Sequence, residues 1–308
     1  MNTHIHVVIV TYNRLDKLKH TLECYDRQTY PPQEIIVVDN HSSDKTAEYL
    51  EDWSSQNSDI SKIVITTEHN LGGAGGFAIG MQEALKHGAE WIWISDDDAY
   101  PDSKALEITA QYCNKLQADT VCVCGSVIHQ GEVDIDHRRI SKGKIIKLPV
   151  KIPKEAYTKE VIDIDETTFV GSCFKADTVR KAGVPLKDFF IYFDDTEFSH
   201  RMAKYGKIRL VPEIIITHDT VTYSQPTDVV ATWRDYYLVR NHVNTLKRHQ
   251  LVSYCAYCIK KIYDTAVSFT RNKNTQLLAM NLHAIYDGMT GHLGLHPIYK
   301  PGYNICIQ

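Results

Sequence analysis

Three consecutive carboxylates follow an apolar segment in the first third of the chain. The segment Trp91–Ser95 has the composition of a buried strand, and Asp96, Asp97 and Asp98 come directly after it. Open α/β sheets bind ligands at the carboxyl ends of their strands. Adjacent carboxylates repel one another unless a cation lies among them, and hard divalent cations prefer oxygen ligands. The pattern predicts a divalent-cation site that also holds a phosphate-bearing ligand; a solvated acidic turn is the alternative.

Two other predicted strands end in polar residues that suit a nucleotide. One ends in the run Thr-Tyr-Asn-Arg at 11–14, and the other ends in Asp39 and Asn40. Because both ends belong to the same half-sheet, we expect them to share one crevice. Asp39 can accept the imide N–H of a uracil or thymine ring, while Thr11 packs against the base and ribose. An Asx turn at Asp39 and Asn40 is the alternative.

A glycine-rich stretch follows the third predicted strand. Four glycines occur at positions 72, 73, 75 and 76, directly after Asn70 and Leu71. Glycine lets the backbone approach a ligand closely and present N–H groups to phosphate or sugar oxygens. The stretch has neither the GxGxxG spacing of dinucleotide-binding folds nor the Gly-Lys-Ser/Thr of a Walker loop. We expect a glycine turn that leads into a helix at about Phe77; a tight turn alone would explain one or two of the glycines.

A second aromatic run also ends in carboxylates. Residues 189–193 are Phe-Phe-Ile-Tyr-Phe, and Asp194, Asp195 and Glu197 follow. A carboxylate at a helix start is ordinarily a cap that favours the helix dipole. An aromatic wall also shields and positions a carboxylate, as a general base that takes a proton from a sugar hydroxyl requires. Farther along, His218 ends another predicted strand, where an imidazole is either structural or completes a metal site made otherwise of carboxylates.

The elements that must position these motifs alternate over the first 125 residues, which is typical of a mostly parallel sheet. Strands are expected at 5–10, 34–39, 60–66, 91–95 and 120–126, and helices at 15–27, 44–56, 77–87 and 103–116. Residues 129–165 are expected to form an insertion or hairpin over the sheet. After it we expect strands at 167–175 and 207–217 and helices at 176–182, 195–205, 228–248, 252–270 and 275–288.

The composition of the chain argues against several classes of partner and location. The 308 residues carry a formal net charge of −4 and no long basic stripe, which argues against nucleic acid. No segment reaches the ~18 uninterrupted apolar residues of a membrane span, and the N-terminus lacks the pattern of a secretory leader. The eight cysteines are scattered, and the CxxC of Cys255 and Cys258 lacks the context of a zinc or redox site. A cytoplasmic protein with reduced thiols is expected.

Six motifs in order resemble the inverting, GT-A-fold family 2 glycosyltransferases. They are Val-Thr-Tyr-Asn-Arg, Val-Val-Asp-Asn-x-Ser, Asn-Leu-Gly-Gly, the Asp triplet, Gly-Ser-Cys-Phe and Asp-Asp-x-Glu, within about residues 5–220. Over 70–81 and 93–99 the chain is most similar to bacterial galactofuranosyltransferases, with rhamnosyltransferases next. The resemblance implies an α/β fold with a Rossmann-like mixed sheet flanked by helices. It implies a catalytic domain at 1–224, with a nucleotide-binding half at 1–125 and an acceptor half at 126–224, and a helical region at 225–308.

The resemblance also implies roles for individual residues. Asp96 and Asp98 would hold Mn²⁺ or Mg²⁺ with His218 as the third ligand, and Asp195 would be the general base. The acceptor would be bound by Asp194, Glu197, Trp93 and Tyr192. The nucleotide and donor would be bound by Thr11, Tyr12, Asn13, Arg14, Asp39, Asn70, Gly72, Gly73, Asp96 and Asp97.

The implied reaction is a single in-line displacement with inversion at the anomeric carbon. The expected donor is a UDP-sugar, UDP-galactofuranose first, and the expected acceptor is a glycan or a polyprenyl-diphosphate-linked saccharide. dTDP-rhamnose or another hexosyl donor is the alternative. Because the mycobacterial galactan polymerases carry an N-terminal β-rich domain that precedes the catalytic core, and this chain starts at the first strand, addition of one or a few sugars is expected.

Two rival functions stand outside glycosyl transfer. A nucleotidyltransferase would need a Gly-rich loop with Arg and Lys after the first strand, where this chain has Thr-Tyr-Asn-Arg-Leu-Asp. A non-catalytic scaffold that binds a sugar nucleotide would not need Asp195 and the Asp triplet together.

The C-terminal helices carry Tyr and basic residues. Residues 233–241 resemble a segment that often follows the catalytic core in the galactofuranosyl- and rhamnosyltransferases. Tyr236, Arg240 and Lys247 fall near helical spacing, and Lys260 and Lys261 continue the basic character. Such residues suit peripheral contact with the inner face of the cell membrane. Packing on the core or against another subunit of a homo-oligomer accounts for them equally well.

Overall fold

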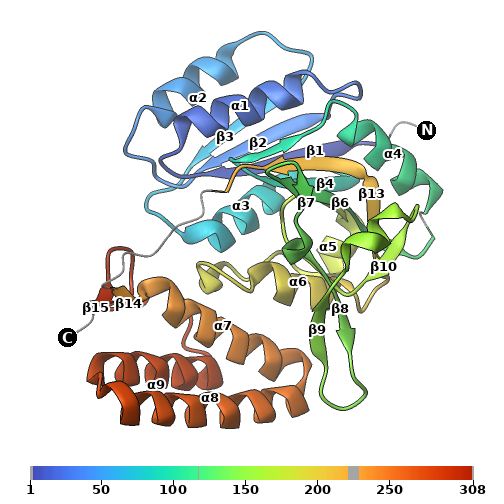
Figure 1. Cartoon of the computed structure of the whole chain (residues 1–308). Coiled ribbons are helices and arrows are strands. Elements are labelled where there is room, and N and C mark those ends of the chain that lie inside the picture. The colour runs from blue at the N-terminus through green and yellow to red at the C-terminus, as the bar shows by residue number, and fades with distance from the viewer. Residues whose placement is uncertain (1–2, 117, 221–228, 307–308) are drawn as a thin grey trace.

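A ten-stranded mixed sheet forms the centre of the molecule (Figure 1). The computed structural model describes residues 3–116, 118–220 and 229–306. Eight strands lie in this order across the sheet: β10 (Ile162–Ile164), β13 (Lys207–His218), β6 (Thr120–His129), β12 (Ser172–Lys175), β4 (Trp91–Asp96), β1 (Ile5–Thr11), β2 (Glu34–Asp39) and β3 (Ser61–Thr66). The short strands β5 (Ala99–Pro101) and β7 (Glu132–Val133) pair with β13 and β6.

The strand order brings the predicted motifs to one edge of the sheet. β3, β2, β1 and β4 are parallel, with Thr11 opposite Asp39 and Val10 opposite Asp96. β12 runs antiparallel between β4 and β6, so the sheet is mixed. Because parallel strands end at the same edge, the polar residues that follow β1, β2 and β4 lie side by side.

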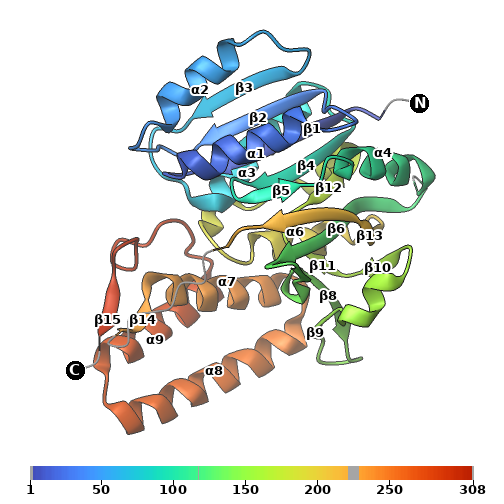
Figure 2. The same cartoon turned by 45° about the horizontal axis from the view of Figure 1, so that its top comes forward.

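Helices cover both faces of the sheet (Figure 1 and Figure 2). α1 (Leu15–Asp26), α2 (Thr46–Ser55) and α4 (Ala105–Lys115) pack on one face. α3 (Gly72–Lys86), α5 (Ala176–Ala182) and α6 (Asp194–Met202) pack on the other. A strand between two helical layers is buried on both sides, which explains why every residue of β1 is buried and the strand is almost wholly apolar.

The expected insertion between residues 129 and 165 contains a hairpin. β8 (Arg138–Lys142) and β9 (Leu148–Lys151) pair with each other, and β11 (Glu166–Thr167) pairs with β8. Turns of 3-10 helix at Ile135–His137 and Lys154–Thr158 flank the hairpin. The hairpin projects towards the C-terminal helices (Figure 1), where the Lys147 N–H donates a hydrogen bond of 3.1 Å to Ser253 Oγ.

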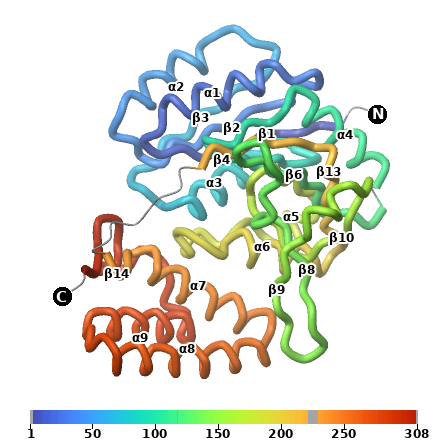
Figure 3. The backbone as a smooth tube through the Cα atoms, viewed as in Figure 1, coloured from blue at the N-terminus to red at the C-terminus, as the bar shows by residue number. Residues whose placement is uncertain are grey.

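Three C-terminal helices follow, as expected: α7 (Trp233–His249), α8 (Leu251–Asn272) and α9 (Thr275–Thr290). They enclose a third apolar cluster, which also includes Phe190 of the α/β part. β14 (Val229–Thr232) and β15 (Asn304–Cys306) pair at one end of this bundle (Figure 3), a pairing that the sequence did not predict. Thr232 and Asp235 form a capping box that starts α7. The expected boundary between 224 and 225 lies outside the described residues.

One predicted turn is wrong. The sequence predicts a glycine turn before a helix at Phe77, but α3 begins at Gly72, so the four glycines form its first turn. Residues 207–218 form a single strand with a register shift between Leu210 and Ile215.

Candidate active site

A cavity of about 540 Å³ opens at the carboxyl edge of the parallel strands. Its walls come from the ends of β1 and β4, the start of α3, the loop before α6 and the start of α7. Eleven of the residues predicted to form the site line it: Thr11, Tyr12, Arg14, Asn70, Gly72, Gly73, Asp96, Asp97, Tyr192, Asp194 and Asp195. The two acidic motifs, which are distant in sequence, therefore border one cavity.

The Asp triplet and His218 form a compact cluster beside the cavity, which Asp96 and Asp97 line and Asp98 and His218 do not. One ligand atom from each of Asp96, Asp98 and His218 lies within 4.8 Å of the others. His218 Nε2 is 3.3 Å from Asp98 Oδ1. β13 brings the imidazole there, since His218 pairs with Ala99 of β5, directly after the triplet. Two positively charged side chains also reach Asp98: Arg14 Nη1 lies 2.9 Å and Lys17 Nζ lies 3.4 Å from Asp98 Oδ2.

The electrostatics of this cluster favour a bound cation. Burial, together with the neighbouring carboxylates, raises the pKa of Asp96 to about 7, although His218 opposes the rise. Burial also raises the pKa of Asp97 to about 6. Burial opposes ionisation of Asp98 as well, but the hydrogen bond and charge of His218 hold the pKa of Asp98 below its usual value. Ionising all three carboxylates is therefore costly without a further positive charge.

The residues present fit a divalent cation such as Mn²⁺ or Mg²⁺. Two carboxylates and one imidazole are a ligand set that such ions accept. His218 is 8% exposed, and its Nδ1 has no hydrogen-bond partner among the described residues. A buried imidazole nitrogen without a partner is uncommon and marks a site whose contacts are incomplete as the side chains stand.

The residues predicted to bind the nucleotide divide into those that reach the cavity and those that lie outside it. Thr11 Oγ1 donates to Asp97 Oδ2 at 2.8 Å, so the hydroxyl orients the triplet. Asp39 is fully buried and does not line the cavity. Its Oδ1 accepts the Ser42 N–H at 3.0 Å, while its Oδ2 has no partner among the described residues. Asn13 lies outside the cavity, where its side-chain oxygen accepts the Ser43 N–H at 2.7 Å.

The glycines at the start of α3 allow close packing. Gly72 has a φ of +73°, and a Cβ there would lie 2.0 Å from the carbonyl oxygen of Phe190. A Cβ on Gly76 would lie 2.5 Å from a methyl group of Val10. The Gly72 N–H donates to Asn70 Oδ1 at 2.7 Å and is not free for a phosphate. Gly73 borders the cavity and has room around it.

Asp194 and Asp195 begin α6 at the opposite wall of the cavity. Asp194 is buried and Asp195 is half-buried. Burial raises the pKa of both carboxyls, and the charge of Asp195 adds to the rise at Asp194. Asp195 Oδ1 accepts the Thr196 N–H at 2.6 Å, which fixes the direction of the carboxylate. A half-buried, oriented carboxylate of raised basicity can act as a general base.

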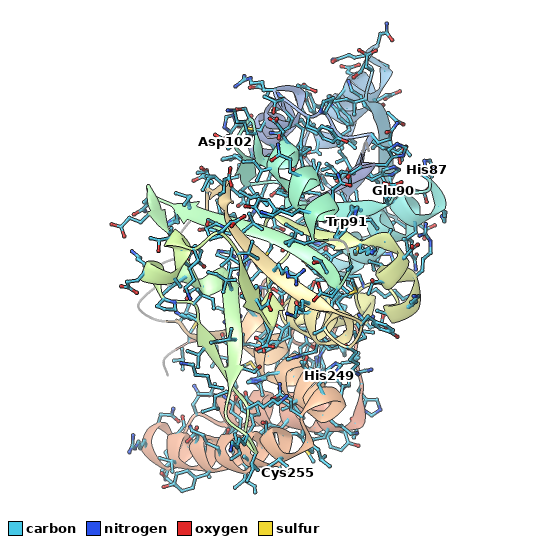
Figure 4. All side chains as sticks on the ribbon, turned by 90° about the vertical axis from the view of Figure 1, so that its right-hand side faces the viewer. His87, Glu90, Trp91, Asp102, His249 and Cys255 are labelled. Carbon is cyan, nitrogen blue, oxygen red and sulfur yellow. The ribbon has the colours of Figure 1, made fainter. Side chains whose placement is uncertain are left out.

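Two predicted acceptor residues lie away from the cavity. Trp93 is fully buried in the core, where its Nε1–H donates to the Tyr25 hydroxyl at 2.8 Å. Glu197 is 1% exposed and pairs with Arg201 Nε at 2.8 Å and His249 Nε2 at 3.1 Å. His249 ends α7, next to the α/β part (Figure 4), so Glu197 joins the helical region to α6. Neither side chain contacts the cavity in the structure, because neighbouring residues cover both.

The cavity also has walls that sequence reasoning missed. Trp233 and Arg234, at the start of α7, line it, as does Phe169 before β12. The Arg234 guanidinium lies over the Trp233 ring at 4.7 Å. Residues 233–241 were singled out from the sequence, with membrane contact and packing on the core or another subunit left open, but their place at the cavity was not predicted. Asn40 was missed as a positioning group: it accepts the Leu71 N–H and donates to the Gly72 carbonyl, each at 2.8 Å.

Comparison with known proteins agrees with this fold. The chain is similar to the galactofuranosyltransferase GlfT1 of Mycolicibacterium smegmatis, with 30% identity over 66% of this chain and 68% of that protein. It is similar to the dTDP-rhamnosyl transferase RfbF of Shigella flexneri, with 24% identity over 96% of this chain and 98% of that protein. The chain spans about two thirds of the length of the galactofuranosyltransferases it matches.

A solved structure with a similar fold is GalNAc-T7 with UDP, GalNAc and Mn²⁺, with a TM-score of 0.63 and 16% identity over 94% of this chain and 56% of that one. The mixed sheet with helices on both faces is thus the GT-A fold of glycosyltransferases. Residues 6–176 match glycosyl transferase family 2, and the chain belongs to that family of enzymes. Among the described residues, no helix has the length and apolar character that crossing a bilayer requires.

Proposed function

We propose that the protein transfers a galactofuranosyl residue from UDP-galactofuranose to a glycan or lipid-linked saccharide acceptor, with inversion at the anomeric carbon. The observation that carries the proposal is a pair of acidic groups at one cavity. Asp96 lines the cavity and forms a cluster with Asp98 and His218, and Asp194 and Asp195 line the opposite wall. The similarity to GlfT1 supports the choice of donor sugar.

The metal cluster and the acidic pair at the start of α6 have separate roles in this mechanism. Asp96, Asp98 and His218 would hold Mn²⁺ or Mg²⁺, which when bound neutralises the charge of the donor diphosphate. Arg14 lies beside them and adds positive charge for the leaving nucleotide. Asp195 accepts the proton of the acceptor hydroxyl, whose oxygen attacks the anomeric carbon as the bond to the diphosphate breaks. Asp194 and Tyr192 orient the acceptor.

Rhamnosyl transfer from dTDP-rhamnose is the second candidate. The similarity to RfbF extends over 96% of this chain, whereas the similarity to GlfT1 extends over 66% of it. The sequence-based expectation that Asp39 accepts the imide N–H of the base applies to uracil and thymine alike, and Asp39 is buried outside the cavity, so it does not distinguish the two donors.

UDP is expected to raise the melting temperature of the protein when Mn²⁺ is present, and dTDP and GDP are expected to raise it less. A ligand at 100 times its dissociation constant adds about 2.7 kcal/mol to the free energy of unfolding, which moves the melting temperature by several degrees. The measurement is thermal unfolding with each nucleotide, with and without Mn²⁺.

Three results would count against parts of the proposal. A larger shift with dTDP would favour rhamnosyl transfer. No shift with any nucleotide would remove the main support for the donor site. Binding of UDP-galactofuranose without release of UDP, with several saccharide acceptors present, would favour the non-catalytic scaffold.

We place the acceptor at the inner face of the cell membrane, because a basic and apolar surface lies beside the helical bundle. Residues 229–308 contain nine Lys and Arg against three Asp, and residues 138–151 contain six Lys and Arg and no acid; of these basic residues, Arg138 and Arg240 are buried. Ile145 of the hairpin is 76% exposed, and Ile259 and Tyr263 of α8 are 71% and 68% exposed. Exposed apolar side chains next to lysines suit an anionic bilayer. In Figure 4, the labelled Cys255 of α8 lies near the hairpin.

Two residues expected at this membrane surface are not there. Arg240 and Tyr236 are each 1% exposed, because they face the interior of the helical bundle. Lys247 and Lys260 are exposed.

Replacing Lys144, Lys147 and Lys260 together by Glu is expected to weaken sedimentation with phosphatidylglycerol vesicles at least tenfold, since each basic residue near such a surface contributes about 1 kcal/mol. The matched control replaces Lys45, Lys159 and Lys204, which are exposed elsewhere, by Glu. Equal vesicle binding by both variants would overturn the membrane contact. A dimer of the unmodified protein in light scattering, lost in an Ile259→Ser/Tyr263→Ser variant that still binds vesicles, would assign the apolar face to a second copy.

A further inference from the structure

The loop that leads into α6 has an unusual backbone conformation. Phe190, Tyr192 and Phe193 have φ angles of 66°, 66° and 64°. Residues with a Cβ rarely adopt this left-handed region, and it persists only where the surroundings hold it. Phe193 is the N-cap of α6, so the loop conformation sets the position of the first two helical residues, Asp194 and Asp195.

Asn241 of α7 binds three carbonyl groups of this loop. Its Nδ2 lies 2.9, 2.8 and 2.9 Å from the carbonyl oxygens of Phe189, Ile191 and Tyr192. An amide group has two N–H donors, so three carbonyls share them. Asn241 is fully buried, and no solvent competes for these bonds.

Arg240 fixes both the loop and Asn241. Its Nε donates to Asn241 Oδ1 at 2.9 Å, which orients the amide with its donors towards the loop. Its Nη2 donates to the carbonyls of Asp188 and Phe189 at 3.2 and 3.0 Å. Arg240 is 1% exposed and has no carboxylate within salt-bridge distance among the described residues, so its charge is satisfied by carbonyl groups.

Two further contacts clamp the loop from either side. The Ala74 N–H at the start of α3 donates to the Phe190 carbonyl at 3.2 Å. The Phe193 ring stacks on His242 of α7, with ring centroids 4.6 Å apart. The loop is thus held between α3, which borders the donor side of the cavity, and three consecutive residues of α7.

We propose that Arg240 and Asn241 are positioning residues for glycosyl transfer: they hold residues 189–193 in the conformation that presents Asp194 and Asp195 to the cavity. This inference rests on the proposed role of Asp195 as the base. It gives the C-terminal helices a part in the reaction that does not depend on membrane contact.

Asn241→Asp is expected to lower kcat about 10²-fold, because small displacements of a reacting group have effects of this size. The substitution keeps the size of the side chain and replaces its two donors by an oxygen that faces three carbonyl oxygens. The dissociation constant for UDP with Mn²⁺ is expected to change less than about twofold, because the metal cluster does not contact this loop. The substitution is therefore expected to lower kcat and to leave nucleotide binding almost unchanged. Deuterium uptake of the segment 186–196 is expected to rise.

Asn244→Asp is the matched control. Asn244 lies on the same helix, is 3% exposed, and donates to the Gly288 carbonyl of α9 at 3.1 Å instead of to the loop. This variant is expected to keep its kcat and the deuterium uptake of 186–196. If Asn241→Asp does not fold, Arg240→Lys replaces it, since lysine keeps the charge but loses the planar fork of donors.

The proposal is overturned if Asn241→Asp has the kcat of the unmodified protein, or if Asn241→Asp and Asn244→Asp lower kcat equally. Normal turnover of Asn241→Asp alongside an inactive Asp195→Asn would overturn only the positioning role. A normal kcat of Asp195→Asn would overturn the proposed role of Asp195 as the base. The deuterium uptake of residues 186–196 would then test only whether Asn241 holds the loop.

Discussion

Asp195→Asn reduces the rate of transfer by about 10²- to 10⁴-fold if this carboxylate is the general base, the range typical of such groups. The amide keeps the shape of the side chain but cannot accept the acceptor's proton. Metal-dependent binding of UDP is expected to persist, because the cluster of Asp96, Asp98 and His218 is unchanged. The measurement is the initial rate of UDP release with donor and acceptor present.

Asp177→Asn separates the chemical role from an effect on helix stability. Asp177 lies in the first turn of α5, as Asp195 lies in the first turn of α6, and it is exposed. Both changes remove a charge that favours the helix dipole. Asp177→Asn is expected to transfer at the normal rate; transfer near that rate by Asp195→Asn would exclude Asp195 as the base.

The unmodified enzyme gives a second readout in its pH profile. Burial raises the pKa of Asp195, although the Thr196 hydrogen bonds and the charge of Arg139 oppose it. A base must be ionised to act, so the rate falls as the pH drops through a midpoint above the usual carboxyl range. Because Asp194 interacts with Asp195, the midpoint belongs to the pair.

Asp98→Asn removes the metal-dependent stabilisation by UDP and lowers transfer at least about 10²-fold, because the cluster loses both a charge and a ligand oxygen. Asp98 is the member of the triplet with the lowered pKa, so it is ionised at neutral pH and available to a cation. The measurements are thermal unfolding with UDP across a Mn²⁺ titration and the rate of transfer at each Mn²⁺ concentration.

Asp102→Asn is the control for this change. Asp102 is an exposed residue of the same segment, where its Oδ1 accepts the Lys104 N–H at 3.1 Å. It is expected to keep the metal-dependent shift. Asp98→Asn with an unchanged Mn²⁺ response would show that the ion binds elsewhere or is not needed.

The parallel half of the sheet was predictable because three of its strands, β1, β2 and β4, are largely buried on both faces. Runs such as Val7–Val10 have no polar face, and helical patterns separate them, so a mostly parallel sheet with a shared edge follows from general rules. The cluster of Asp96, Asp98 and His218 was expected from the resemblance to family 2 glycosyltransferases. Asp96 and His218 end strands, and Asp98 lies in the turn between β4 and β5. The structure confirms that these side chains lie together.

The remaining differences concern the direction of side chains and contacts between distant segments. The resemblance placed Trp93 at the acceptor, but its position along β4 turns its side chain into the core. Arginine is usually found at the protein surface, and Arg240 is buried because it donates hydrogen bonds to the carbonyls of Phe189 and its neighbours in the loop. The glycine stretch was interpreted as a ligand contact because the carbonyl of Phe190, which occupies the space beside Gly72, is remote in sequence.

The two cationic side chains on Asp98 have a consequence for the order of binding. In the structure, Arg14 and Lys17 are the counter-ions of this carboxylate. A divalent cation that ligates Asp98 competes with both groups for this carboxylate. Arg14 then keeps Asp97 and Lys17 keeps Asp219 as its carboxylate partner, so the positive charge of both is less fully neutralised. A diphosphate arriving at the same place supplies the missing negative charge. Metal and nucleotide should therefore each increase the affinity for the other, and thermodynamic linkage requires the two increases to be equal.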